Sequence, residues 1–187
     1  MSTIQPDTSV KDLLSTILPQ KTTESIAARG AEKDLDGSTV TMCLDISGQF
    51  YSYVLTNGNN IEVANEKKDD AMVLIQVSDE DLTKMIQNSE LDIIQMVITE
   101  MDKTKYETVR RLSGTFKGEL GNDDGSTYTI AVTFNAAADP NCVFKMKTSD
   151  TAKMMRKEEN PVNLFMSGAM QIEGDMQFAM ATQPLFV

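Results

Sequence analysis

Residues 160–180, NPVNLFMSGAMQIEGDMQFAM, carry the most specific structural signal in the sequence. It predicts a short apolar helix that ends at Gly168, a strand that alternates up to Ile172-x-Gly174-Asp175, and a terminal helix. Glycines at both ends of the strand permit tight turns or close backbone approach. Asp175 is placed to cap the terminal helix through its side-chain oxygen. The stretch therefore predicts a helix–strand–helix unit.

Methionine is concentrated around this unit. Seven of the 13 methionines lie between Met146 and Met180. On the terminal helix Met176, Ala179 and Met180 share one face, since residues three and four positions apart are neighbours on a helix. Methionine suits surfaces that accommodate varied apolar shapes, but it fills irregular cores equally well. Composition alone favours a core, with a binding surface as the alternative.

Upstream, apolar residues recur with the period of two that is typical of half-buried strands. Val40, Met42, Leu44 and Ile46 alternate with polar neighbours, and turn residues follow at 57–60 and 121–125. The fold class is therefore α+β with a largely antiparallel sheet. Further strands are expected at 50–56, 61–64, 72–77, 115–120, 128–134 and 143–148.

Helical periodicity predicts several segments between and before these strands. One helix covers residues 10–18 and is stopped by Pro19, and a second covers 23–29 and ends at Gly30. Ser78 and the pair Ser149-Asp150 are expected to cap two later helices. A long helix between them is predicted to carry an apolar side made of Leu91, Ile94, Ile98, Met101, Val109 and Leu112.

The two halves of the chain show a weak internal repeat. Residues 73–79 match 144–150, residues 49–56 resemble 126–133, and the predicted elements follow in the same order. A degenerate tandem duplication is the preferred interpretation, and chance similarity of short β-rich segments is the alternative. The predicted halves are residues 1–103 and 104–187, either as separate modules or packed as one merged domain.

Composition excludes several classes of function. The chain has no histidine, which removes Ser-His-Asp and Cys-His nucleophiles and histidine-dependent zinc sites. We predict no enzyme activity, no catalytic residue, no cofactor and no metal site. The loop at Asn122–Gly125 lacks the ligand alternation of an EF-hand and predicts a hairpin turn.

Charge and targeting signals limit the partners and the location. The formal net charge is −11, which argues against nucleic acid and allows at most transient membrane contact. The N-terminus has no apolar signal region, and Cys43 and Cys142 form no Cys-x-x-Cys pair. A cytoplasmic location with reduced thiols is expected.

The ordered set of motifs in residues 104–186 resembles the sterol-carrier-protein type 2 family. Residues 113–132 (SGTF, the DDG loop and YTIAV) are similar to its first hairpin, 143–150 to its next strand and helix, and 160–180 to its signature. The first half matches more loosely and lacks the Ile-x-Gly-Asp element. The resemblance implies a twisted sheet covered by helices, with an apolar tunnel between them that the terminal helix closes.

The resemblance also implies a function, namely non-catalytic binding and transfer of fatty acyl, sterol or isoprenoid-like ligands. The alternatives are a scaffold that binds a partner's amphipathic segment and a non-catalytic subunit of a lipid-metabolising enzyme, which would add a protein partner. The side chains predicted to be buried, several of them lining one apolar cavity, are Phe165, Met166, Ile172, Met176, Phe178 and Met180. The first half is predicted to lack a tunnel. The expected ligand-binding residues are Phe134, Met146, Phe165, Met166, Met170, Ile172, Met176, Phe178, Met180 and Phe186.

Overall fold

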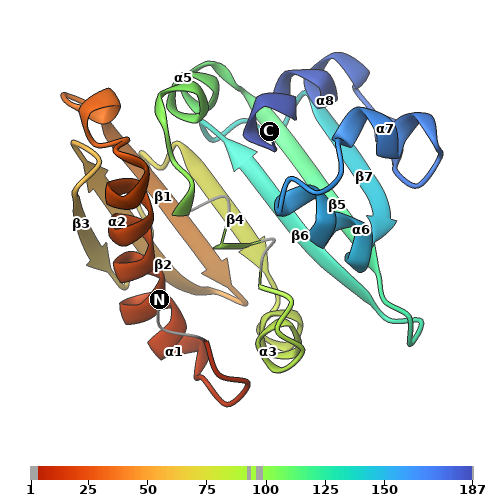
Figure 1. The fold of residues 1–187 in the computed structure, drawn as a ribbon, viewed down its shortest axis with the longest axis horizontal. Coiled ribbons are helices and arrows are strands. Elements are labelled where there is room, and N and C mark those ends of the chain that lie inside the picture. Colours follow the sequence, from red (N-terminus) through yellow and green to blue (C-terminus); the bar gives the residue numbers. More distant parts are fainter. Residues whose placement is uncertain (1–3, 92–93, 96–98, 187) are drawn as a thin grey trace.

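The computed structural model describes residues 4–91, 94–95 and 99–186. Their strands form one sheet in the order β3-β2-β1-β4-β6-β5-β7-β8 (Figure 1). Five of the seven neighbouring pairs are antiparallel, so the predicted α+β class with a mostly antiparallel sheet is confirmed. The strands are β1 (Thr39–Ile46), β2 (Gln49–Thr56), β3 (Asn60–Ala64), β4 (Val73–Val77), β5 (Gly114–Gly121), β6 (Thr127–Phe134), β7 (Asn141–Lys147) and β8 (Gln171–Gly174).

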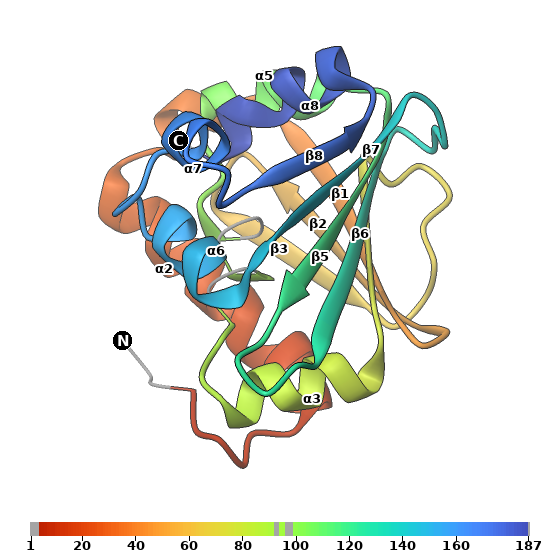
Figure 2. The same ribbon diagram turned by 90° about the vertical axis from the view of Figure 1, so that its right-hand side faces the viewer.

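The helices gather on one face of the sheet and at its ends (Figure 2). The N-terminal helix lies over the first half of the sheet, and three short helices lie over the second half (Figure 1). The helices are α1 (Val10–Asp12), α2 (Leu18–Arg29), α3 (Asp79–Gln87), α5 (Lys103–Arg111), α6 (Thr148–Met155), α7 (Pro161–Met166) and α8 (Met176–Thr182), with a π-helical turn at Leu13–Ile17 and 3-10 turns at Lys33–Leu35 and Gln183–Leu185.

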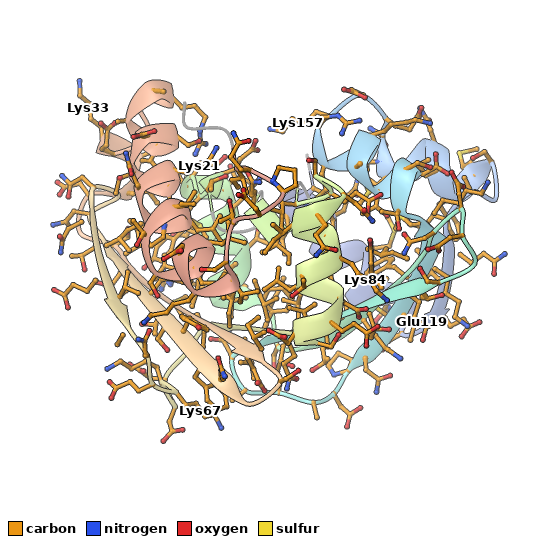
Figure 3. All side chains as sticks on the ribbon, turned by 90° about the horizontal axis from the view of Figure 1, so that it is seen from below. Lys21, Lys33, Lys67, Lys84, Glu119 and Lys157 are labelled. Carbon is orange, nitrogen blue, oxygen red and sulfur yellow. The ribbon has the colours of Figure 1, made fainter. Side chains whose placement is uncertain are left out.

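The opposite face of the second half of the sheet is charged. Side chains alternate between the faces of a strand, so Lys117 and Glu119 point away from the helices while their neighbours point toward them. Lys117 pairs with Glu119 at 2.8 Å, and Lys145 pairs with Glu173 at 2.9 Å. In Figure 3 Glu119 lies beside the strands of the second half, whereas Lys21 and Lys157 lie on the side of the helices. One face therefore meets solvent, and the apolar interior lies on the other.

Each half of the sheet is built around a central strand with the same kinds of partner. β1 pairs antiparallel with β2 and parallel with β4. β5 pairs antiparallel with β6 and parallel with β7. The order β2-β1-β4 is then followed directly by β6-β5-β7. β6 closes the free edge of β4, and β8 closes the free edge of β7 in the same antiparallel sense.

The N-terminal helix does not stop at Pro19, so that prediction is wrong. The chain widens into the π-helical turn, in which the Leu18 N–H bonds the carbonyl of Leu13, and it continues as α2 to Gly30. Proline is tolerated near the start of a helical segment because the N–H it lacks has no obligatory partner there. The carbonyl of Leu14 instead accepts a hydrogen bond of 2.6 Å from the hydroxyl of Tyr53, beneath it on β2.

The other predicted helix boundaries meet mixed outcomes. Ser78 caps α3 as predicted, since its Oγ accepts the N–H of Asp81. Ser149-Asp150 does not cap α6, because the helix already begins at Thr148 and these residues lie in its first turn. The long helix predicted up to Leu112 is wrong for the described residues, since the extended backbone of Asp102 separates α5 from what precedes it. Ile98 lies outside the described residues.

The Tyr53–Leu14 hydrogen bond ties the N-terminal helix to the sheet and can be tested by mutation. Tyr53 is 1% exposed, so Tyr53→Phe leaves a buried carbonyl without a donor and should cost about 1–3 kcal/mol of unfolding free energy. In a Pro19→Ala background the cost should shrink, because residue 19 then supplies an N–H for the same carbonyl. Urea unfolding of both single variants and the double variant measures the coupling. Equal costs in the two backgrounds would contradict this assignment.

Candidate functional site

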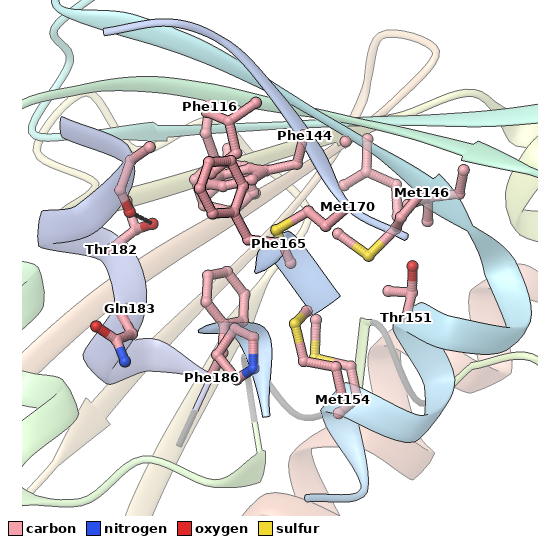
Figure 4. Close-up of a pocket in the computed structure, with 18 of the residues that line it drawn as sticks. Phe116, Phe144, Met146, Thr151, Met154, Phe165, Met170, Thr182, Gln183 and Phe186 are labelled. Carbon is pink, nitrogen blue, oxygen red and sulfur yellow. Dashed lines mark hydrogen bonds between the residues drawn. The ribbon is translucent and has the colours of Figure 1, made fainter. Parts of the chain in front are cut away.

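A cavity of about 240 Å³ lies between the second half of the sheet and helices α6, α7 and α8. Its sheet side comes mainly from β5, β6 and β7, and its helix side from the three helices and the C-terminal residues (Figure 4). The sheet contributes Ile75, Phe116, Gly118, Leu120, Ile130, Val132, Phe144, Met146 and Ile172. The remaining lining residues are Ile94, Thr151, Met154, Met155, Pro161, Val162, Phe165, Met170, Ala179, Met180, Thr182, Gln183 and Phe186.

The middle of β5 provides the space on the sheet side. Phe116, Gly118 and Leu120 alternate along this strand and all three face the cavity. A Cβ built on Gly118 would lie 3.7 Å from the nearest atom, on Leu120, which is ordinary contact distance. Neither a positive φ nor a close approach therefore requires glycine here. Because Gly118 has no side chain, the cavity keeps a volume that a larger residue would occupy.

Aromatic rings form one wall of the cavity. The ring of Phe116 lies 5.6 Å from that of Phe144 and 5.9 Å from that of Phe186, both edge to face. Edge-to-face pairs at these separations are favourable beyond their buried area. Phe186 follows the 3-10 turn at Gln183–Leu185, which brings its ring into the wall (Figure 4).

The position of α8 is set by the turn that precedes it. Gly174 has a φ of 94°, and a Cβ there would lie 2.6 Å from the carbonyl oxygen of Asn141 on β7. The N–H of Asp175 bonds that carbonyl at 2.8 Å, and its Oδ1 accepts the N–H of Phe178. The predicted cap by Asp175 is confirmed. Glycine and aspartate together hold the start of α8 against β7.

Six of the ten predicted site residues line the cavity. They were found because the signature segment and the methionine concentration point to the right end of the chain. The other lining residues on the sheet were recognised as strand residues, but the alternation did not reveal which face borders a cavity. The six are Met146, Phe165, Met170, Ile172, Met180 and Phe186.

The other four predicted residues do not line the cavity. Phe134 is buried and packs against Phe116, with ring centroids 5.9 Å apart. Phe178 is also buried and covers the backbone of Gly114, where a Cβ would meet its ring at 2.8 Å. Met166 and Met176 point outward instead. The signature segment predicts Met166 and Met176 as site residues without indicating which face of their helices meets solvent.

The expected burial of the signature side chains is partly wrong. Ile172 is partly buried and Phe178 is buried, but Phe165, Met176 and Met180 are 42–52% exposed and Met166 is 81% exposed. The reason is the length of α7 and α8, six and seven residues, because a helix of two turns buries only one face. That face is occupied by Leu164 on α7 and by Phe178 and Ala179 on α8.

The lining offers an apolar surface without charge. Its polar side chains are Thr151, Thr182 and Gln183, and both threonine hydroxyls already donate to main-chain carbonyls. The nearby thiol of Cys142 does not line the cavity. Burial, reinforced by Asp175, raises the pKa of this thiol to about 11, so it is protonated at neutral pH. Such a surface can solvate hydrocarbon but has no charged group to hold an ionised ligand.

Two negative findings concern the described residues only. Residues 4–91, 94–95 and 99–186 contain no group of three or more cysteine, aspartate or glutamate side chains that could hold a metal ion. Within the same ranges, no helix has both the length and the apolar character that crossing a membrane requires.

Comparison with known proteins identifies relatives for the second half of the chain. The SCP-2 sterol transfer family matches residues 94–187, half of the sequence. No curated protein matches the chain.

Several solved structures resemble the chain with low sequence identity. Apo sterol carrier protein 2 from Yarrowia lipolytica is 16% identical and covers 51% of this chain and 90% of its own, with a TM-score of 0.38. The sterol carrier protein domain 2 of Helicoverpa armigera is 20% identical and covers 54% and 84%, with a TM-score of 0.38. A structure described as "UbiJ-SCP2 Ubiquinone synthesis protein" is 13% identical and covers 94% and 91%, with a TM-score of 0.32.

The cavity can be tested with a small apolar probe, since dry apolar cavities bind xenon. We expect xenon to shift the methyl resonances of Met146, Met154, Met155 and Met170 in protein carrying ¹³C-methyl methionine. Met42 and Met85 are fully buried outside the cavity and serve as controls within the same spectrum. The outcome that contradicts the cavity is a uniform shift of all methionines or no shift at all.

Proposed function

This chain belongs to the SCP-2 sterol transfer family, and from that premise we propose that it binds and transfers lipids without catalysing a reaction. The family match agrees with the resemblance seen in the sequence of residues 104–186. The observation that carries the proposal is the uncharged, almost wholly apolar lining of the cavity beside β5. Burial of each methylene in such a space contributes about 0.8 kcal/mol, which favours long hydrocarbon ligands.

The size of the cavity indicates how such a ligand would be held. Its 240 Å³ is below the roughly 300–1,000 Å³ that is usual for small-molecule pockets. Val162, Phe165 and Met180 line the cavity and are also 40–52% exposed, so they form its mouth. A long ligand would place part of its chain inside and extend through this mouth between α7 and α8. Fatty acyl and isoprenoid-like ligands fit this description, and a sterol would enter with its hydrocarbon tail.

The absence of catalysis is proposed on the chemistry of the lining. Acid–base and nucleophilic catalysis need a titratable or activated group beside the reacting atom. The described lining residues include none, and the thiol of Cys142 is held protonated by burial. A protein partner in lipid metabolism stays a prediction.

The two halves are proposed to be a degenerate duplication, of which the second copy carries the cavity. The repeated segments of the sequence align β2 with β6 and β4 with β7. The central strands β1 and β5 are not part of these segments. Through the pairing of the sheet, both alignments place Met42 on β1 in the position of Gly118 on β5. Met42 lies opposite Tyr53 on β2 and Val73 on β4. In the alignment these two residues correspond to Ile130 and Phe144, which lie opposite Gly118.

This correspondence accounts for the difference between the halves. Met42 is fully buried, and Leu14, Leu18 and Ile26 of the N-terminal helix are buried on the same half of the molecule. In the first half the side chain of Met42 thus fills the space that corresponds to the one left open at Gly118 in the second half. The first half would serve as a packed support, and ligand would bind with a stoichiometry of one.

The proposal is tested by filling the space at Gly118. Gly118→Met should lower the affinity for a fluorescent fatty acid at least about tenfold, because the added side chain occupies apolar volume that the ligand would otherwise fill. Gly121→Met is the matched control, since residue 121 ends the same strand, does not line the cavity and has open space around its Cβ. Fluorescence titration measures binding, and circular dichroism checks that both variants keep the fold.

The decisive comparison is between the two variants. The proposal requires that Gly118→Met loses binding and that Gly121→Met keeps it, with both folded. If wild-type protein binds no lipid, the carrier function fails. If folded Gly118→Met binds as tightly as the wild type, the ligand is held elsewhere.

A further inference from the structure

Exposed apolar side chains are concentrated around the mouth of the cavity. Of six large apolar side chains that are exposed in the described residues, five lie on α7 and α8, and the sixth, Val63, lies on the edge strand β3. Exposed apolar residues scattered singly are normal, but a contiguous group marks an interaction site. We call this group the mouth patch: Val162, Phe165, Met166, Met176 and Met180.

The mouth patch is also free of charge. Helices α7 and α8 contain no charged residue, although 24% of the whole chain is charged. The charged residues from position 160 onward are Glu173 and Asp175. Glu173 is paired with Lys145, and Asp175 caps α8. Transfer of the mouth patch out of water therefore removes no charged side chain of α7 or α8 from solvent.

The patch and the cavity are continuous. Val162, Phe165 and Met180 belong to both, whereas Met166 and Met176 belong to the patch alone. A lipid that moves between the cavity and a bilayer must pass these side chains. If they are already inserted between headgroups, the hydrocarbon of the ligand never crosses water.

We propose that the mouth patch docks on bilayers of zwitterionic or uncharged lipid, with its apolar side chains inserted at the headgroup boundary. The proposal rests on the lipid-carrier function and identifies the surface through which that site would exchange its ligand. Amphipathic surfaces of this kind bind through apolar area and, where basic, through attraction to anionic lipid. Here the basic component is missing.

Charge and geometry both favour an uncharged bilayer over a partner protein at the mouth patch. Juxtamembrane Lys and Arg clusters attract anionic membranes, but the patch has none and the chain carries a net charge of −11. Anionic lipid should therefore weaken docking. A partner helix laid across the patch would cover the mouth and block the path of the ligand, whereas a bilayer opens onto it.

The test is flotation of the full chain with vesicles. Wild-type protein should bind phosphatidylcholine vesicles with little dependence on salt, and less well when anionic phosphatidylglycerol is included. The double variant Met166→Asp/Met176→Asp should bind at least about tenfold more weakly, since it puts two charges into the inserted surface. Val63→Asp, with the same change at an exposed apolar residue outside the patch, should float like the wild type.

Ligand binding in solution separates this proposal from the carrier function. The double variant should bind a fluorescent fatty acid normally, because neither residue lines the cavity, but should deliver it to acceptor vesicles more slowly. The docking proposal is overturned if wild type does not float, if flotation increases with anionic lipid, or if the double variant floats normally. If the wild-type protein does not bind the fluorescent fatty acid, the carrier function is overturned instead.

Discussion

The antiparallel pairing of β4 with β6 determines how the whole molecule is assembled. It joins the strands of both halves into one sheet, with Ile75 opposite Val132 at its middle. Both of these residues also line the cavity, so the first half supplies part of the wall. Without β4, β6 would become an open edge, and unpaired edges are a liability for a sheet. The second half therefore carries the cavity but depends on the first for its sheet.

The same arrangement explains why the signature Ile-x-Gly-Asp element occurs once. In the second half β8, which carries Ile172 and Gly174, closes the edge of β7. In the first half the corresponding edge of β4 is closed by β6, which belongs to the other half. A strand equivalent to β8 would have no free edge to occupy there. The strand order thus leaves β4 no free edge with which a strand of that kind could pair.

Much of this architecture could be predicted from the sequence, because period-two alternation and turn residues are local signals. The strands, the caps at Ser78 and Asp175 and the α+β class follow from such signals. The continuation of the first helix through Pro19 could not be predicted, since it depends on the hydroxyl of Tyr53, which is distant in sequence. The exposure of Met166 was missed because periodicity does not tell which face of a short helix meets solvent.

The site shows the same division between local and distant information. The signature segment and the methionines identified the end of the chain that borders the cavity, including Met146, Phe165 and Ile172. Gly118 carried no local signal, since a glycine within a strand reads only as a weakness or a bulge. Its meaning depends on pairings across the sheet that place it where Met42 stands in the other half.

The central claim is that the second half encloses a site for one lipid molecule. Native mass spectrometry of freshly purified protein tests it most directly, because a carrier should retain lipid from the cell in which it was made. The expected spectrum contains a population heavier than the bare chain by the mass of one lipid, and organic extraction removes this lipid for identification. Only the mass of the bare chain, both before and after incubation with lipid, would contradict it.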